Sequence, residues 1–494
     1  MLSRTVGEIA RLIEDQGCPC RIEGDPAVRV GPEVVIDTRQ VSPGALFVGL
    51  PGEHVDGADL APAAGRAGAG AALVGHPVDA DLPCLVSPQA AAGLSALARG
   101  LVDEQRRRGL VTFAITGSAG KTSTKDLLAQ VLAASAPTVS PVGNHNNEIG
   151  VPLTACALDD TTRFLVSEMG ARGIGHIAAL CRIVPPTIST VLNVGTAHLG
   201  EFGSRDAIAR AKGEILEALP PDGWAVLNAG DPRVDAMEAR TRARIARWCA
   251  APGGSEQDVR RVRAELVVSA SQIAFDDLDR ASFTLHARTE DEESSQRVRL
   301  GLIGAHQLPN AVAAATMALA AGLGLDAVAD ALSHATTRSP LRMELHETAG
   351  GAAIINDCYN ANPESVEAAL GALADIGRAR RRSHPGARTI AVLGDMAELG
   401  SQSAALHAAV GSRAGELGID EVIGVGEFGE IVARAAQSAG ARARRAAKQE
   451  VAGLIELCPG DVVLVKASRV LKLEEITDQL LDRAAGGAEG RIHR

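Results

Sequence analysis

The length, composition and charge of the chain indicate a multidomain globular protein. Its 494 residues are too many for one hydrophobic core and enough for about three domains at the usual ~100–200 residues each. The charged fraction of 22% and the hydrophobic fraction of 46% exclude a disordered or fibrous chain. A formal charge of −11 with only 2% aromatic residues argues against a nucleic-acid-binding protein, which needs a basic face and stacking side chains.

Cysteine spacing and hydropathy predict a cytoplasmic protein. The eight cysteines are scattered and only Cys18 and Cys20 are close together, so we expect reduced thiols. Glu8 falls where a signal peptide needs an apolar run. The longest apolar stretch, residues 311–325, is shorter than the ~20 residues that a membrane span needs. We therefore expect no membrane insertion, and we also expect a monomer.

Lysine is rare, with six residues against 43 arginines. Arginine evidently supplies a positive charge wherever a generic one is needed. A lysine is therefore expected to mark a position that requires an ammonium or a neutral amine. The six positions are Lys121, Lys125, Lys212, Lys448, Lys466 and Lys472.

Residues 1–108 are predicted to form a small first α/β domain. The polar segment Asp37-Thr38-Arg39 follows one of its strands, and it is either a surface turn or a site for a diphosphate, which a hydroxyl and an arginine suit. The predicted elements are a helix over 6–13, strands over 34–36, 45–50 and 71–74, and a connecting helix over 89–107.

A second domain is predicted over residues 109–338 and a third over 339–494. Strands alternate with helices in both, which predicts parallel, doubly wound sheets, while residues 264–302 show the alternation of β-strands. No internal repeat is found. The predicted strands are 111–115, 164–166, 188–192, 390–393, 421–425 and 461–465, and helices are expected from 122, over 207–218 and from 309.

A glycine-rich segment lies between the strand ending at residue 115 and the helix that follows. It reads Gly-Ser-Ala-Gly-Lys-Thr, which is shorter than the common G-x-x-x-x-G-K-[ST] spacing. Its backbone N–H groups can approach phosphate oxygens at a helix N-terminus, and the lysine and threonine add an ammonium and a Mg²⁺-binding hydroxyl. We therefore predict a nucleotide-binding site. The alternative is a glycine-rich turn in which the lysine has no function. The expected contacts are Gly117, Ser118, Ala119, Gly120, Lys121, Thr122 and Ser123.

Three more side chains are candidate site residues, each with an ordinary alternative. Glu168 ends an apolar strand at the sheet edge where open α/β folds bind ligands, so it is either a metal carboxylate or a solvated strand end. His198 follows another strand end, where a histidine also caps helices. Lys212 lies beside Arg210 on a predicted helix, where the alternative is a solvated lysine.

Several segments resemble the Mur ligases, and the resemblance covers all three predicted domains. The short glycine-rich loop is shared with folylpolyglutamate synthetases, so the other segments decide between the two. The last two of these segments look like the member that adds D-alanyl-D-alanine. The segments are 143–154, 168–170, 193–199, 209–215, 356–363 and 393–400.

The resemblance implies an α/β fold with a UDP-sugar-binding first domain, a central P-loop ATPase domain and a C-terminal Rossmann-like domain. It implies an ATP- and Mg²⁺-dependent ligase of peptidoglycan synthesis that joins D-alanyl-D-alanine to UDP-N-acetylmuramoyl-tripeptide through an acyl phosphate. Another Mur-type or folylpolyglutamate-type amide ligase is the alternative within enzymes. A silent nucleotide-binding protein on this fold would have lost Lys121, Glu168, His198 or Lys212, and the chain keeps all four.

The resemblance also implies roles for single residues. Thr122 and Glu168 would hold a metal on the ATP phosphates. His198 and a carbamylated Lys212 would hold a second one, a role that arginine cannot take. Lys121, Glu168, His198 and Lys212 are thus the expected catalytic residues.

The remaining implied contacts lie in segments that partly depart from the family pattern. Gln307 stands where the family has asparagine, and Ala467 interrupts the family's Lys-Gly-Ser-Arg. The expected ATP contacts here are Asn310, Arg342 and Asp357. The expected substrate contacts are Thr38, Arg39, Asn147, Tyr359, Asn360 and Asn362.

Overall fold

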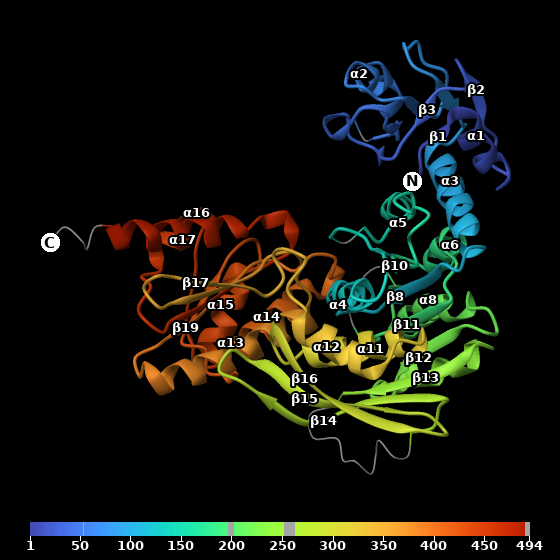
Figure 1. Ribbon diagram of the computed structural model, residues 1–494. Coiled ribbons are helices and arrows are strands. Elements are labelled where there is room, and N and C mark those ends of the chain that lie inside the picture. The colour runs from blue at the N-terminus through green and yellow to red at the C-terminus, as the bar shows by residue number, and fades with distance from the viewer. Residues whose placement is uncertain (53, 144, 196–201, 251–261, 490–494) are drawn as a thin grey trace.

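The computed structural model describes residues 1–489 apart from 53, 144, 196–201 and 251–261. Three α/β units follow one another along the chain, built on sheets of five, nine and six strands (Figure 1). The predicted α/β class with a mainly parallel central sheet is confirmed. Boundaries at 108 and 338 fall between the sheets and stay predictions.

The first sheet has the strand order β2-β7-β6-β5-β4, in which β4 to β7 run parallel and β2 is antiparallel to β7. The strand predicted over 71–74 is confirmed, and its two predecessors are shorter than expected. The long helix α3 leads from this unit to the next (Figure 1). The elements are β1 (Arg4–Thr5), α1 (Val6–Glu14), β2 (Arg21–Glu23), β3 (Arg29–Val30), β4 (Val34–Val35), η1 (Thr38–Gln40), β5 (Leu46–Val48), η2 (Gly57–Leu60), α2 (Ala61–Arg66), β6 (Ala71–Val74), β7 (Cys84–Val86) and α3 (Ala90–Arg106).

Helix α1 illustrates how local sequence sets an element. Thr5 accepts a hydrogen bond from the backbone of Glu8, whose carboxylate accepts one from the backbone of Thr5, and this capping box starts the helix. Val6, Ile9 and Ile13 then fall on one buried face. The prediction of this helix is confirmed.

The central sheet has nine strands in the order β16-β15-β14-β13-β12-β11-β8-β10-β9. Strands β8 to β14 are parallel. The alternation over 264–302 predicted β-strands, and β14 to β16 confirm it as an antiparallel part of the sheet. The strands are β8 (Val111–Thr116), β9 (Thr138–Val139), β10 (Phe164–Glu168), β11 (Ile188–Val191), β12 (Trp224–Asn228), β13 (Arg244–Cys249), β14 (Leu266–Phe275), β15 (Arg280–Arg288) and β16 (Glu293–Ile303).

Helices α4 and α11 pack together and lie against the core of this sheet. Helix α11 begins two residues before its predicted start at Pro309, because proline is tolerated in the first turn of a helix. The described helical segments here are α4 (Lys121–Ala133), α5 (Gly150–Ala155), α6 (His176–Ile183), α8 (Arg205–Glu217), α9 (Pro232–Asp235), η3 (Ala236–Arg240), α11 (Gln307–Ala320) and α12 (Leu325–His334).

The third sheet has the order β17-β18-β22-β19-β20-β21, parallel except for β17. The last strand in the sequence, β22, is fully buried between β18 and β19. Its elements are β17 (Glu344–Glu347), β18 (Ala353–Asp357), α13 (Pro363–Ser383), β19 (Thr389–Leu393), η4 (Gly400–Gln402), α14 (Ser403–Glu416), β20 (Glu421–Gly424), α15 (Gly429–Ser438), β21 (Arg442–Arg445), α16 (Lys448–Leu454), β22 (Val462–Lys466), η5 (Arg469–Leu471) and α17 (Glu474–Glu489).

All eight cysteines are free thiols. Within the described ranges, every helix is too short or too polar to cross a membrane.

Strand register explains where the site forms. Parallel pairing sets Glu168 of β10 beside Ile115 of β8, and Val191 of β11 beside Thr116. Three chain segments therefore leave the sheet at the same carboxyl edge, which is where open α/β sheets bind ligands.

Candidate active site

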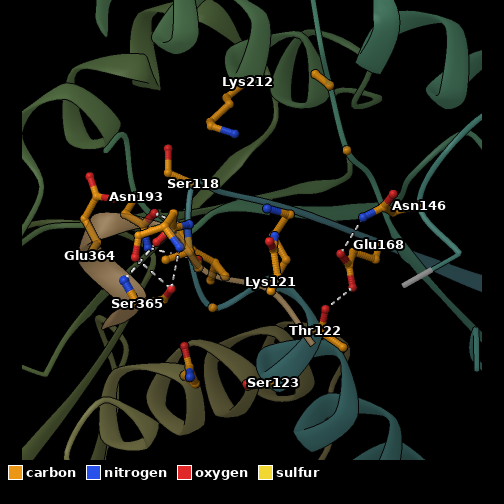
Figure 2. Close-up of a pocket in the computed structure, with 18 of the residues that line it drawn as sticks. Ser118, Lys121, Thr122, Ser123, Asn146, Glu168, Asn193, Lys212, Glu364 and Ser365 are labelled. Carbon is orange, nitrogen blue, oxygen red and sulfur yellow. Dashed lines mark hydrogen bonds between the residues drawn. The ribbon is translucent and has the colours of Figure 1, made fainter. Parts of the chain in front are cut away.

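A cavity of about 1000 Å³ lies at this edge, between the central and third units. Figure 2 shows the lining side chains pointing inward from both units. Most of the predicted site residues line it, namely Ser118, Ala119, Gly120, Lys121, Thr122, Ser123, Asn147, Glu168, Lys212, Asn310, Arg342, Asp357, Tyr359, Asn360 and Asn362.

The glycine-rich loop is held by the segment that follows β11. The backbone N–H of Ala119 donates to the side-chain oxygen of Asn193 (2.9 Å), whose amide nitrogen donates back to Ala119 O (3.1 Å). Ser118 Oγ accepts from the N–H of Gly195 at 2.9 Å. These contacts fix the backbone of the loop, and Asn193 is a contributor that the sequence did not single out.

Gly120 is the residue just before α4 and has a left-handed conformation, with φ +81°. A Cβ at this position would lie 2.5 Å from Asn310 Oδ1, so the loop needs glycine both for its backbone and for close approach. Asn310 is itself oriented by Gln307 (3.1 Å) and by Thr124 (3.3 Å).

Gly120→Ala is expected to weaken ATP binding and to lower the free energy of unfolding by about 1–2 kcal/mol. Gly109→Ala is the matched control, because Gly109 has φ +94° with nothing within 4 Å of a Cβ. Both variants should show the stability loss in denaturant titrations, whereas only Gly120→Ala should lose affinity for a fluorescent ATP analogue. Equal affinities in the two variants would contradict the close approach of Asn310.

Lys121 is the first residue of α4, and its Nζ donates to Gly117 O at 2.7 Å. Burial lowers the pKa of this lysine, the nearby Glu168 carboxylate raises it, and the charge of Arg342 lowers it again. The ammonium therefore lies inside the loop, where an added anion would stabilise its charge.

Thr122 and Glu168 come together as the sequence predicted. Thr122 Oγ1 donates to Glu168 Oε2 at 2.8 Å, and Glu168 Oε1 accepts from the Asn146 amide at 2.8 Å. Figure 2 shows this chain of contacts beside Lys121. Glu168 is only 1% exposed, so the reading of a solvated strand end is wrong. A hydroxyl and a carboxylate at this spacing are the oxygen donors that Mg²⁺ takes.

Lys212 of α8 is 5% exposed and lines the cavity. It is therefore no solvated helix lysine, and Figure 2 shows its amine directed toward the glycine-rich loop. Burial, followed by the like charge of Lys121, lowers the pKa of Lys212 well below its ordinary value. The charged form of this lysine is thus less favoured than that of an exposed lysine.

The other expected metal ligand, His198, lies outside the described residues. Within the described ranges, no three or more His, Cys, Asp and Glu side chains gather as a metal cluster.

The third unit contributes a buried ion pair. Lys466 Nζ, at the end of β22, lies 2.7 Å from Asp357 Oδ2 and 2.9 Å from Asn360 O. Asp357 also accepts from the backbone of Met343 at 3.2 Å. Lys466 thus orients Asp357, one of the predicted ATP contacts, and the rarity of lysine could have indicated this role.

Two cavity groups with buried nitrogens lack a hydrogen-bond partner among the described residues. They are Nε of Arg342 and Nδ1 of His306. Arg342 lies over the ring of Tyr359 at 4.3 Å, which fixes the plane of its guanidinium. Burial lowers the pKa of His306, so this ring is favoured in its neutral form. The sequence did not single out His306.

Some predicted substrate residues have structural tasks within the cavity wall. Asn147 accepts from the backbone of Gly150 at 2.9 Å, and Asn362 caps α13 by accepting from Ser365 at 2.8 Å. Asn360 accepts from the next residue, Ala361, at 2.8 Å.

Thr38 and Arg39 lie in η1 of the first unit and do not line the cavity. Arg39 is exposed and pairs with Asp37 at 2.6 Å. Hydrogen bonds from Arg39 lower the pKa of Asp37 to about 2. A contact of these residues with a diphosphate stays a prediction.

Comparison with known proteins agrees with this geometry. The family models of the Mur ligase catalytic domain, the Mur ligase middle domain and the Mur ligase glutamate ligase domain match residues 33–114, 115–318 and 341–469. The UDP-N-acetylmuramoyl-tripeptide–D-alanyl-D-alanine ligase of Mycobacterium tuberculosis H37Rv is 38% identical, covering 97% of this chain and 98% of the relative. The Escherichia coli K12 protein of the same name is 34% identical, covering 90% and 93%.

Solved structures show the same relation. A crystal structure of MurF from Acinetobacter baumannii has a TM-score of 0.81 at 29% identity, and it covers 97% of this chain and 99% of that one. MurF ligase from Thermotoga maritima in complex with ADP has a TM-score of 0.72 at 26% identity, covering 92% and 98%. The chain therefore belongs to the Mur ligase family of enzymes.

Proposed function

We propose that this protein joins D-alanyl-D-alanine to UDP-N-acetylmuramoyl-tripeptide, at the expense of ATP and through an acyl phosphate, in peptidoglycan synthesis. The observation that carries the proposal is the cavity in which a phosphate loop, a buried carboxylate and a buried lysine face the third unit. Relatives named for this reaction match nearly the whole chain.

The chain's own residues divide the work of phosphoryl transfer, which is mostly positioning and charge neutralisation. The N–H groups of the glycine-rich loop and the Lys121 ammonium bind the ATP phosphates. Asp357, held by Lys466, and Arg342, stacked on Tyr359, contact the nucleoside from the third unit. The two units thus enclose ATP and exclude water from the acyl phosphate.

Mg²⁺ fits the oxygen pair of Thr122 and Glu168, and when bound it neutralises charge between the phosphates and the acceptor carboxylate. A carbamylated Lys212 fits a second position. Its amine is buried and faces the cavity, and burial and the charge of Lys121 lower its pKa, which increases the fraction of the neutral amine that captures CO₂. Carbamylation would place an anion at this position, which the positive charge of Lys121 would stabilise.

The first unit is proposed to bind the UDP group through Thr38 and Arg39. Arg39→Ala is expected to raise the Kd for UDP-tripeptide by about tenfold or more, because a charge-assisted hydrogen bond is lost, and to leave ATP affinity unchanged. Isothermal titration calorimetry with each ligand measures the affinities for UDP-tripeptide and for ATP separately. Arg21→Ala is the control, since Arg21 is an exposed arginine of the same unit paired with Glu23. Equal loss of both ligands in Arg39→Ala would contradict this assignment.

The test of the proposed function is phosphate release by the purified protein with ATP, Mg²⁺, UDP-muramoyl tripeptide and D-alanyl-D-alanine. Sustained release should require all components, and tripeptides ending in lysine and in diaminopimelate are compared in parallel. Release supported by a different amine or acceptor would favour another Mur-type or folylpolyglutamate-type ligase. No release with any acceptor would favour a silent nucleotide-binding protein. A monomeric state and a cytoplasmic location stay predictions from the sequence.

A further inference from the structure

A carboxylate of the third unit reaches the segment after β11 that holds the glycine-rich loop. Glu364, in the first turn of α13, lines the cavity together with Ser118, Lys121 and Lys212. In Figure 2 its side chain extends toward the loop segment that carries Ser118. This carboxylate is half-buried and belongs to a different unit from the phosphate loop.

Gly195 makes this approach possible. A Cβ at residue 195 would lie 2.8 Å from Glu364 Oε1 and 3.2 Å from Ser118 Cβ. Gly195 is not among the glycines with positive φ, so its backbone does not demand glycine. The absence of a side chain at Gly195 instead leaves room for the carboxylate oxygen of Glu364 beside the segment that hydrogen-bonds the glycine-rich loop.

The other acidic side chains that line the described part of the cavity are placed differently. Glu168 ends β10 of the central unit, and Asp357 ends β18, where it lies 2.7 Å from Lys466. Glu148 and Glu398 are exposed. Among the acidic side chains that line the described part of the cavity, Glu364 is thus the third-unit carboxylate that lies beside Gly195.

We propose that Glu364 binds the ammonium of the incoming dipeptide and accepts its proton. The inference rests on the proposed function, because an acyl phosphate on the tripeptide must be attacked by an amine. A carboxylate beside the loop both attracts the cationic amine and removes the proton that blocks its lone pair.

The reaction joins the dipeptide ammonium to the acyl phosphate of the tripeptide. The ammonium transfers one proton to Glu364 and becomes a neutral amine. The nitrogen lone pair then forms the C–N bond to the acyl carbon while the C–O bond to phosphate breaks. The second amine proton leaves with the phosphate, and the Glu364 proton passes to solvent when the products depart.

Hydroxylamine distinguishes a loss of this proton acceptor from a defect in ATP binding or in acyl-phosphate formation. It is largely uncharged at neutral pH, so it attacks an acyl phosphate without an ammonium site or a base, and it gives a hydroxamate. Glu364→Gln should lower kcat for ligation by about 10²-fold and raise KM for the dipeptide by about tenfold. Hydroxamate formation from ATP and UDP-tripeptide should stay near the wild-type rate.

A control distinguishes the proposal from a helix-end effect. Glu430→Gln removes the acidic residue in the first turn of α15, which lies outside the cavity. This variant should keep ligation near the wild-type rate. Gly195→Ala, which pushes the carboxylate away, should lower ligation more than hydroxamate formation.

Equal loss of ligation and hydroxamate formation in Glu364→Gln would overturn the proposal, and so would unchanged ligation. Failure of the wild type to form hydroxamate at all would instead overturn the proposed function, and this proposal with it.

Discussion

Replacing Lys212 with arginine is expected to abolish ligation, with a loss on the order of 10³-fold or more. Arginine keeps the length and the positive charge but cannot form a carbamate, so the cavity would hold a fixed cation where an anionic metal ligand is expected. Several kcal/mol of charge stabilisation would be lost, and each 1.36 kcal/mol is tenfold in rate. The rate of phosphate release with all substrates measures the effect.

The control for this substitution is Lys448→Arg. Lys448 is the first residue of α16 and lies outside the cavity, where it pairs with Glu475 of α17 at 2.9 Å. Arginine at this position should therefore leave the rate near that of the wild type. Wild-type protein depleted of CO₂ should also lose activity, and labelled bicarbonate should give a ¹³C carbamate signal that Lys212→Arg lacks. An active Lys212→Arg enzyme would rule out the carbamate.

Removing the Lys121 ammonium is expected to lower kcat by about 10²- to 10³-fold, the usual loss for one charge-stabilising group at a reacting centre. The fold should survive in Lys121→Ala, because the Lys121 side chain donates to a single loop carbonyl at Gly117. Steady-state kinetics and a thermal melt measure the two effects, with Lys448→Ala as the control. Near-normal turnover would contradict the phosphate role of Lys121.

Local patterns predicted much of the fold. The helix at residues 6–13 and the strand at 71–74 were predicted from the local sequence, and the glycine-rich loop was predicted from its order of strand, turn and helix. Short, polar or edge strands such as β9 and β21 were missed. Their pairing depends on neighbours distant in sequence, and this pairing leaves little local signal.

The candidate site likewise contains residues that could be predicted from local sequence and contacts that could not. Lys121, Thr122 and Glu168 could be predicted because each lies at or just after the end of a strand that reaches the same sheet edge. The contact of Lys466 with Asp357 and that of Glu364 with Gly195 join segments more than 100 residues apart. No local spacing encodes such contacts. The first needs β18 and β22 to pair within the third sheet, and the second needs the third unit to be folded against the central one.

The most direct test of acyl-phosphate ligation follows oxygen from the acceptor carboxylate. UDP-muramoyl tripeptide labelled with ¹⁸O in its terminal carboxylate is incubated with the enzyme, ATP and D-alanyl-D-alanine. The ¹⁸O content of the products is then measured by mass spectrometry. One ¹⁸O should appear in inorganic phosphate for each peptide bond formed, because the carboxylate oxygen that accepts the phosphoryl group leaves with it. Peptide product accompanied by unlabelled phosphate would contradict the mechanism, and labelled tripeptide recovered without any peptide product would contradict ligation itself.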